Sequence, residues 1–379
     1  MPDEPYHIVF ERHGGVGDVL FTTPVLRYYR THPVEQAAAN GFGTDRPLRI
    51  TFSTQQRNDF IFRGRERLID ERIELFPLQY RLHHKTVDDA AFVRQCRENQ
   101  AKIRRRPDAI ISFFEAVERN DLANHINVYD WHLQWAGIDP ESVKPGAKRP
   151  AYQISPKESD RAERILSRCP GAENFRIAIQ MHASSLPRTW DKNDRLIKAI
   201  CRRWPEIAVY SFGDEVARML ELTPPERPSN YMPLCGATKE DRRLWAAMIG
   251  GMNLLITVDS GAMHIAGALG IPLVGLFSTV PGWTRLKYYY QAIAIDSDCS
   301  CAPCFRIGME CARSIPTPGI DWIPSMNIRG KNETYPCLSN IGVEQVMAAV
   351  EKQVEQLWTR KSRKVMKAEM KTKPTLSRA

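Results

Sequence analysis

The sequence lacks any segment typical of a membrane span or a secretory signal peptide. Its first residues, Met1–Tyr6, are acidic, and only a short apolar stretch, Ile8–Phe10, follows them. A membrane-spanning helix needs about 20 predominantly apolar residues, and a signal peptide begins with a basic segment. We therefore expect a cytoplasmic protein.

Cysteine is absent from the first 95 residues, and the nine cysteines lie between Cys96 and Cys337. In a reducing compartment such thiols belong to the core or bind metals before they form disulfides. The chain also lacks internal repeats, and its 43% hydrophobic and 26% charged residues are typical of a soluble globular protein. At about 100 to 200 residues per domain, a chain of 379 residues predicts two domains.

The formal net charge of +9 is unevenly distributed along the chain. Residues 358–379 hold eight lysines or arginines against a single acidic residue, Glu369. The rest of the chain is therefore nearly neutral, which argues against nucleic acid as a partner. We expect residues 358–379 to form a disordered, solvated tail. Weak peripheral contact with anionic lipid headgroups at the inner face of the cytoplasmic membrane is the alternative.

Strand-like and helix-like segments alternate along the first half of the chain. The predicted strands are Tyr6–Arg12, Pro47–Ser53, Ile73–Phe76 and Asp108–Phe114. The predicted helices are Asp18–Arg30, Asp88–Arg104 and Asn120–Ala136, with Gly137 as a C-cap. This alternation is typical of an α/β unit.

A second alternating series follows a segment rich in proline, residues 139–152, which marks the junction of two domains. Its predicted strands are Phe175–Met181, Ile207–Phe212, Leu254–Val258 and Leu273–Phe277. Its predicted helices are Asp191–Trp204, Lys239–Gly250, Met263–Leu269 and a final helix with Val343, Val346, Val350, Val354 and Leu357 on its apolar face. We therefore predict two doubly wound domains, residues 1–150 and 151–357.

A glycine loop of Gly14, Gly15 and Gly17 lies between the first predicted strand and the first predicted helix. Small residues at this position let backbone N–H groups approach a phosphate or a sugar. A dinucleotide-binding unit would also place an acidic residue at the end of its second strand, but Ser53 and Thr54 stand there. The absence of this acidic residue argues against a nicotinamide-dependent oxidoreductase.

Asp18 follows this loop, and Thr22, Thr23 and Pro24 complete the run. A carboxylate in the first helical turn is either an N-cap or a general base that faces the space between the domains. Pro24 should kink the helix or restart it. We expect the three glycines and the two threonines to line the cleft.

The second half contains a turn from strand to helix, residues 258–264, with the sequence VDSGAMH. The free N–H groups of the helix and its dipole would meet a diphosphate at Ser260, Gly261 and Ala262, with His264 within reach. Asp259 would order the turn. A histidine on a helix is otherwise usually structural.

Two other sets of polar residues follow predicted strands of the second half. The hydroxyls of Ser184 and Ser185 and the guanidinium of Arg188 would bind both phosphates of a leaving nucleotide, unless Arg188 is a solvated loop charge. Asp214 and Glu215 would offer a carboxylate to a ribose hydroxyl.

Four cysteines, Cys301, Cys304, Cys311 and Cys337, lie in the loop-rich region 298–337. Four thiolates would hold Zn²⁺ or iron tetrahedrally and staple the loop as a structural site. Their spacing differs from a regular pair of CxxC motifs, so free or partly paired thiols are the alternative.

Two motifs together resemble glycosyltransferase family 9, the ADP-heptose:lipopolysaccharide heptosyltransferases. They are GDVLFTTPVLR at residues 17–27 and DSGAMHIAGALGIP at residues 259–272, and the similarity extends over residues 6–357. The resemblance implies a GT-B fold, in which two Rossmann-like domains face a central cleft. The N-terminal domain would bind the acceptor and the C-terminal domain the nucleotide sugar.

The resemblance also implies an inverting transfer of a heptose-like sugar from ADP-heptose to a lipopolysaccharide-core or related anionic glycan or glycolipid, without a cofactor for catalysis. Asp18 matches the catalytic base and Arg188 the basic phosphate-binding position. Ser184, Ser185 and residues 260–264 match the donor-binding loops. The alternatives are a protein heptosyltransferase of the autotransporter type and a GT-B enzyme for another nucleotide sugar. A non-catalytic relative would lack Asp18 or Arg188, and both are present.

Overall fold

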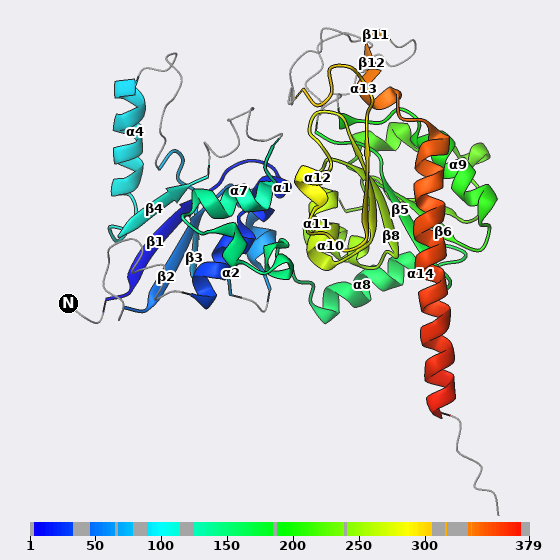
Figure 1. The fold of residues 1–379 in the computed structure, drawn as a ribbon, viewed down its shortest axis with the longest axis horizontal. Helices are drawn as coiled ribbons and strands as arrows, with labels where there is room; N and C mark the ends of the chain where they lie inside the picture. The colour runs from blue at the N-terminus through cyan, green and yellow to red at the C-terminus, as the bar shows by residue number, and fades with distance from the viewer. Residues whose placement is uncertain are drawn as a thin grey trace, which may run out of the picture.

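The computed structural model describes residues 4–32, 46–64, 67–78, 89–113, 125–184, 188–238, 241–304, 315–316, 333–334 and 336–372. Two parallel β-sheets lie side by side along the long axis of the molecule, one built from each half of the chain (Figure 1). A short antiparallel pair, β11 (Ile315–Pro316) and β12 (Glu333–Thr334), adds a two-stranded sheet. The α/β class predicted from the alternating segments is confirmed.

The first sheet has the strand order β3-β2-β1-β4, and all its pairs are parallel. Its strands are β1 (Tyr6–Glu11), β2 (Leu48–Ser53), β3 (Glu71–Ile73) and β4 (Ala109–Ser112). Its helices are α1 (Val16–Leu20), α2 (Thr23–Thr31), α4 (Asp89–Ala101) and α7 (Val128–Trp135), with the 3₁₀ helix η1 (Gln56–Phe62). Every residue of β1 is buried, as a central parallel strand covered on both faces requires.

The second sheet has the order β10-β9-β8-β5-β6-β7 and is also parallel. Its strands are β5 (Arg176–Gln180), β6 (Ala208–Phe212), β7 (Tyr231–Pro233), β8 (Leu254–Val258), β9 (Leu273–Phe277) and β10 (Ala292–Asp296). Counted within this unit, the order is that of the Rossmann fold, and the strand order reverses between β5 and β8. Ligands of such sheets bind at the carboxyl ends of the strands at this point.

Helices and 3₁₀ turns connect and cover the second sheet. They are η2 (Pro140–Ser142), η3 (Pro145–Lys148), α8 (Pro156–Leu166), α9 (Asn193–Arg203), η5 (Val216–Leu220), η6 (Pro224–Glu226), α10 (Arg242–Gly250), α11 (Gly261–Leu269), α12 (Trp283–Leu286), α13 (Pro336–Ser339) and α14 (Val343–Thr372). The predicted proline-rich junction contains η2 and η3, and the division near residue 150 stays a proposal. Among the described residues, none of the helices combines the length and the hydrophobicity that a membrane span requires.

Two predicted elements differ from the structure. The third strand is Glu71–Ile73 and not Ile73–Phe76, because pairing with β2 and not local hydrophobicity sets its position at the sheet edge. The helix predicted from Asn120 begins only at Val128 within the described residues, because the Asn127 side chain accepts a hydrogen bond from the Tyr129 N–H and caps it there. Residues 114–124 lie outside the described ranges.

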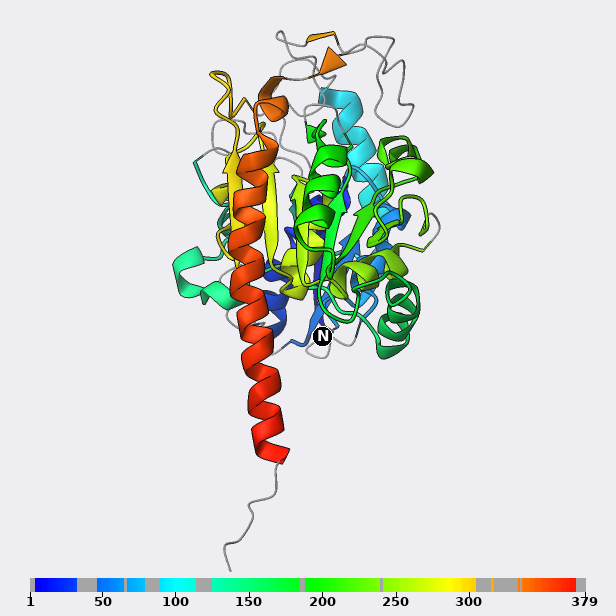
Figure 2. The ribbon, with the colours of Figure 1, turned by 90° about the vertical axis from the view of Figure 1, so that its right-hand side faces the viewer.

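The predicted effect of Pro24 is confirmed, because the chain forms α1, breaks, and restarts as α2. The expectation of disorder from residue 358 is wrong, because α14 continues to Thr372 and runs past the body of the molecule (Figures 1 and 2). Residues 359–372 contain no glycine or proline, so the helix extends from its packed first turns until shortly before Pro374. Residues 373–379 are not among those described.

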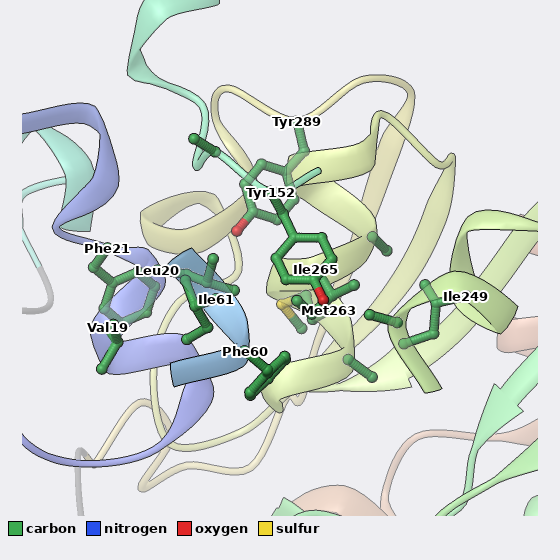
Figure 3. Close-up of a cluster of buried hydrophobic side chains, with 14 of the residues drawn as sticks. Val19, Leu20, Phe21, Phe60, Ile61, Tyr152, Ile249, Met263, Ile265 and Tyr289 are labelled. Atoms are coloured by element: carbon green, nitrogen blue, oxygen red, sulfur yellow. The ribbon is translucent and has the colours of Figure 1, made fainter. Parts of the chain in front are cut away.

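The two halves pack directly against each other through one apolar cluster. Figure 3 shows side chains of α1 and η1 next to side chains of α10 and α11. Its labelled members are Val19, Leu20, Phe21, Phe60, Ile61, Tyr152, Ile249, Met263, Ile265 and Tyr289. This contact fixes the relative position of the two sheets and of the loops that follow their strands.

Candidate active site

Asp18 lies in the first turn of α1, directly after the glycine loop that follows β1. Its Oδ1 accepts a hydrogen bond from Arg12 Nη2 at 2.6 Å, and its Oδ2 accepts one from the Gly15 N–H at 2.7 Å. Gly14 has φ +129°, and a Cβ there would lie 2.6 Å from Asp18 Oδ2. The glycine loop therefore wraps around the carboxylate, whose side chain remains 30% exposed.

Asp18 is a carboxylate anion at neutral pH. Burial raises its pKa, but the charge of Arg12 and the Gly15 N–H outweigh burial and hold the pKa below its usual value. Arg12 is itself buried and was not predicted as a site residue. The only sequence signal for it is a charged residue at the end of an apolar strand.

Arg188 joins the two strands at which the order of the second sheet reverses. Its Nη1 donates to the Asp259 carbonyl oxygen at 3.0 Å, and its Nη2 donates to Ser184 Oγ at 2.8 Å. Ser184 follows β5 and Asp259 follows β8, so Arg188 contacts both loops, and binding of phosphates by this set stays a prediction. Ser185 lies outside the described residues.

Asp259 is a buried anion between two arginines. Its carboxylate oxygens lie 3.8 Å from Arg188 Nη1 and 4.0 Å from Arg285 Nε. Burial raises its pKa, but His264 and the two arginines hold it well below the usual value. The next residues, Ser260, Gly261 and Ala262, form the N-terminus of α11, where helical N–H groups are free for an anion.

His264 is almost completely buried, and both of its ring nitrogens have partners. Nδ1 lies 2.6 Å from the Tyr289 hydroxyl, and Nε2 lies 3.5 Å from Asp259 Oδ1. The imidazole therefore faces the protein interior, and a contact between His264 and a ligand stays a prediction. The α11 backbone directs the ring inward toward the apolar cluster, where its Nε2 contacts Asp259.

The two halves meet at their glycines beside Asp18. A Cβ on Gly17 would lie 2.5 Å from His264 Cδ2, and a Cβ on Gly261 would lie 3.0 Å from Val16 Cβ. The helix that carries Asp18 therefore touches the helix whose N-terminus forms the predicted phosphate site. Sequence positions more than 240 residues apart are brought into one site.

Thr22 and Thr23 do not line this site. Both are fully buried, and their hydroxyls donate to the carbonyls of Val19 and Leu20 at 2.8 and 2.7 Å. Thr23 Oγ1 also accepts from the Ala151 N–H at 2.8 Å. The two hydroxyls form hydrogen bonds with the last carbonyls of α1, and Thr23 also holds the junction segment. The prediction that these threonines line the cleft is therefore corrected.

The predicted ribose contacts follow β6 at the same edge of the sheet. Asp214 Oδ2 lies 3.2 Å from His182 Nε2, and its Oδ1 accepts from the Ala217 N–H at 3.1 Å. Glu215 lies 3.9 Å from Arg218. Both carboxylates are about half exposed, so a contact with a ribose stays a prediction.

The described residues include only part of the cysteine set. Cys301 Sγ lies 3.4 Å from Cys299 Sγ, and Cys304 follows nearby in the chain. Cys311 and the side chain of Cys337 lie outside what the structure describes. Within the described part of the chain, no group of three or more His, Cys, Asp or Glu residues is arranged to hold a metal ion.

The structure adds site residues that sequence reasoning missed. Arg285 packs over the Phe21 ring, with its guanidinium carbon 5.5 Å from the ring centroid. The hydroxyl of Tyr129 on α7 forms a hydrogen bond with that of Tyr289. Nothing in the local sequence indicates the tyrosine pair.

Two parallel Rossmann-like sheets with facing glycine and helix-terminal loops define the fold of a GT-B glycosyltransferase. Residues 139–313 match the model of glycosyltransferase family 9 (heptosyltransferase). The matched segment contains the second of the two motifs, residues 259–272, and the first motif lies outside it.

Several known proteins are similar to this chain. Lipopolysaccharide heptosyltransferase 1 of Pseudomonas aeruginosa is 37% identical over 62 residues, which are 16% of this chain and only 17% of that relative. A family 9 glycosyl transferase from Veillonella parvula has a TM-score of 0.60 at 18% identity, over 95% of this chain and 99% of that one. The iron-containing dodecameric glycosyltransferase TibC from enterotoxigenic E. coli H10407 has a TM-score of 0.56 at 12% identity, over 94% of this chain and 80% of its own. TibC has also been solved in complex with ADP-D-beta-D-heptose. At these identities the structures support the fold alone.

Proposed function

We propose that the protein is an inverting glycosyltransferase that moves a heptose-like sugar from ADP-heptose to an anionic glycan or glycolipid of the lipopolysaccharide-core type. The observation that carries the proposal is the contact of α1 with α11, which brings Asp18 beside the anion site at Ser260 to Ala262. The family 9 domain and the relative from Pseudomonas aeruginosa support the reaction class. The TibC complex supports ADP-heptose as the donor.

In the proposed reaction Asp18 accepts the proton of the acceptor hydroxyl. The hydroxyl oxygen attacks the anomeric carbon from the face opposite the diphosphate, the bond between that carbon and the diphosphate breaks, and ADP leaves. Arg12 and the Gly15 N–H hold the carboxylate in one orientation and keep it ionised. A positioned general base contributes roughly 10²- to 10⁴-fold to such a rate.

The donor side stabilises the charge that develops on the leaving diphosphate. The guanidinium of Arg188, the hydroxyl of Ser184 and the N–H groups at the start of α11 lie on neighbouring loops. Preorganised donors of this kind act most strongly where negative charge develops. Asp259 orders these loops through Arg188 and His264, and the two flanking arginines offset its own negative charge.

Three finer assignments belong to the same proposal. Asp214 or Glu215 binds the donor ribose, the cysteine set holds structural Zn²⁺ or iron, and the basic end of α14 makes weak peripheral contact with anionic headgroups. TibC, described as iron-containing, supports the metal. Elemental analysis of the purified protein and of a Cys301→Ser variant tests the metal, because loss of bound metal in the variant is expected.

The donor is tested first with thermal shifts. Full-length protein should be stabilised by ADP-heptose more than by GDP- or UDP-sugars, and a preference for UDP-sugars would favour the runner-up, a GT-B enzyme for another nucleotide. Transfer to lipopolysaccharide-core acceptors is then followed by mass spectrometry, and the anomeric configuration of the product by NMR. A product that retains the donor's configuration would overturn the inverting mechanism.

A further inference from the structure

Four buried polar side chains form a continuous row of polar contacts from the first half of the molecule to the donor site. The Tyr129 hydroxyl contacts the Tyr289 hydroxyl, which lies 2.6 Å from His264 Nδ1. His264 Nε2 lies 3.5 Å from Asp259 Oδ1. All four residues are at least 93% buried, so their polar groups depend mainly on partners within the protein.

The chemistry of the four groups fixes where the hydrogens lie. Asp259 is an anion between Arg188 and Arg285 and only accepts, so the hydrogen of the imidazole lies on Nε2 of His264. In the neutral imidazole Nδ1 then accepts, and the Tyr289 hydroxyl must donate to it. The oxygen of Tyr289 in turn accepts from Tyr129. Every hydrogen therefore points toward Asp259.

The row crosses between the halves at the tyrosines. Tyr129 is on α7 and packs edge-on against Phe21, with ring centroids 5.6 Å apart. Phe21 also contacts the His264 ring, at a centroid distance of 4.6 Å. The Tyr289 ring lies against α11 so closely that a Cβ on Gly267 would be 2.3 Å from it. Figure 3 shows Tyr289 beside α11, opposite Phe21.

We propose that Tyr129 and Tyr289, together the tyrosine bridge, are positioning residues that hold His264 with its hydrogen directed at Asp259. They thereby keep the donor-binding turn in register with Asp18. The kinetic consequence of this inference rests on the proposed function. The tautomer and protonation of the His264 ring can be measured whether or not the protein transfers a sugar.

Loss of a hydroxyl has a defined effect on His264. The charged groups that face its ring are Asp259, Arg285 and Asp18, and burial lowers the pKa of His264. The donated hydrogen bond from Tyr289 stabilises the neutral ring. Without it, as in Tyr289→Phe, the pKa of His264 should rise, and the ring can turn or exchange tautomers.

Histidine ¹⁵N NMR on full-length protein tests the bridge without requiring sugar transfer. In the wild type the His264 signals should show a neutral ring with hydrogen on Nε2. In Tyr289→Phe the ring should titrate at higher pH, and in Tyr129→Phe it should shift in the same direction by less. Hydrogen on Nδ1 in the wild type, or unchanged signals in both variants, would overturn the proposal. Because no transfer is needed, its failure and the failure of the proposed function are distinguishable.

Kinetics provide the second test, with Tyr288→Phe as the matched control. Tyr288 is the adjacent residue, and its hydroxyl also bonds across the halves, donating to Asp130 and accepting from Lys148 at 3.0 Å. Tyr289→Phe should lower kcat about 10- to 100-fold with little change in donor KM. The acid limb of the pH profile of kcat should move to higher pH. Tyr129→Phe, a substitution in the other half, should do the same more weakly. If Tyr288→Phe and Tyr289→Phe lowered kcat equally, the tyrosine bridge would only hold the two halves together, and the proposed positioning of His264 would be overturned.

Discussion

The contact between Gly17 and His264 predicts a large kinetic effect from a single methyl group. In Gly17→Ala the new Cβ would lie 2.5 Å from His264 Cδ2, whereas carbon atoms pack at about 3.5 to 4.0 Å. The imidazole cannot move aside freely, because Tyr289 and Asp259 hold it and it is buried. The halves must separate locally by about 1 Å, and a displacement of this size can lower a rate about 100-fold.

The matched control is Gly15→Ala in the same loop. A Cβ there would lie 3.4 Å from its nearest neighbour, Asp18 Oδ2, and the backbone φ of −76° suits alanine. Initial rates at saturating donor should fall about 100-fold for Gly17→Ala and change less than threefold for Gly15→Ala. Equal rates of Gly17→Ala and wild type would refute the claim that catalysis depends on this contact between α1 and α11.

Three further predictions concern arginines. Arg188→Ala should weaken ADP binding about 10- to 100-fold by calorimetry, because it removes a charge from the phosphate site, and unchanged affinity would exclude that role. Arg12→Gln should raise the pKa of Asp18, because burial then dominates, so the acid limb of kcat/KM should move to higher pH and not stay in place. Arg243 binds Glu158 through both carboxylate oxygens and holds its pKa at about 2. Arg243→Ala should therefore lower the free energy of unfolding by about 3 kcal/mol in urea. The wild type should lose this advantage as pH falls from about 4.5 to 2, and equal stabilities at pH 7 would contradict the prediction.

The sequence predicted the central strands best. Leu254–Val258 and Leu273–Phe277 coincide with β8 and β9, because each is a short apolar run that is buried on both faces. The edge strand Glu71–Ile73 carries charges and is only half buried, so its position follows from the partner strand and not from its own pattern. A short polar cap, Asn127, likewise determined where α7 begins.

The same limit applies to the site. Asp18 and the turn after β8 were singled out because each stands next to a glycine at the end of a strand, and Arg188 because it lies in the loop that follows β5. The tyrosine bridge joins positions 160 residues apart, so no local spacing reveals it. Thr22 and Thr23 show the opposite case. Both lie inside a recognisable motif, yet their buried hydroxyls bind the carbonyls at the break between α1 and α2 and do not face the cleft.

The central claim is that Asp18 is the base that activates the acceptor. Asparagine keeps the shape of the side chain and an oxygen for the Gly15 N–H but removes the charge and the basicity. A steady-state comparison of wild type and Asp18→Asn, with ADP affinity measured in parallel, tests this directly. The account predicts that kcat falls about 10²- to 10⁴-fold while the Kd for ADP stays within about threefold. A variant that transfers sugar as fast as the wild type would contradict it.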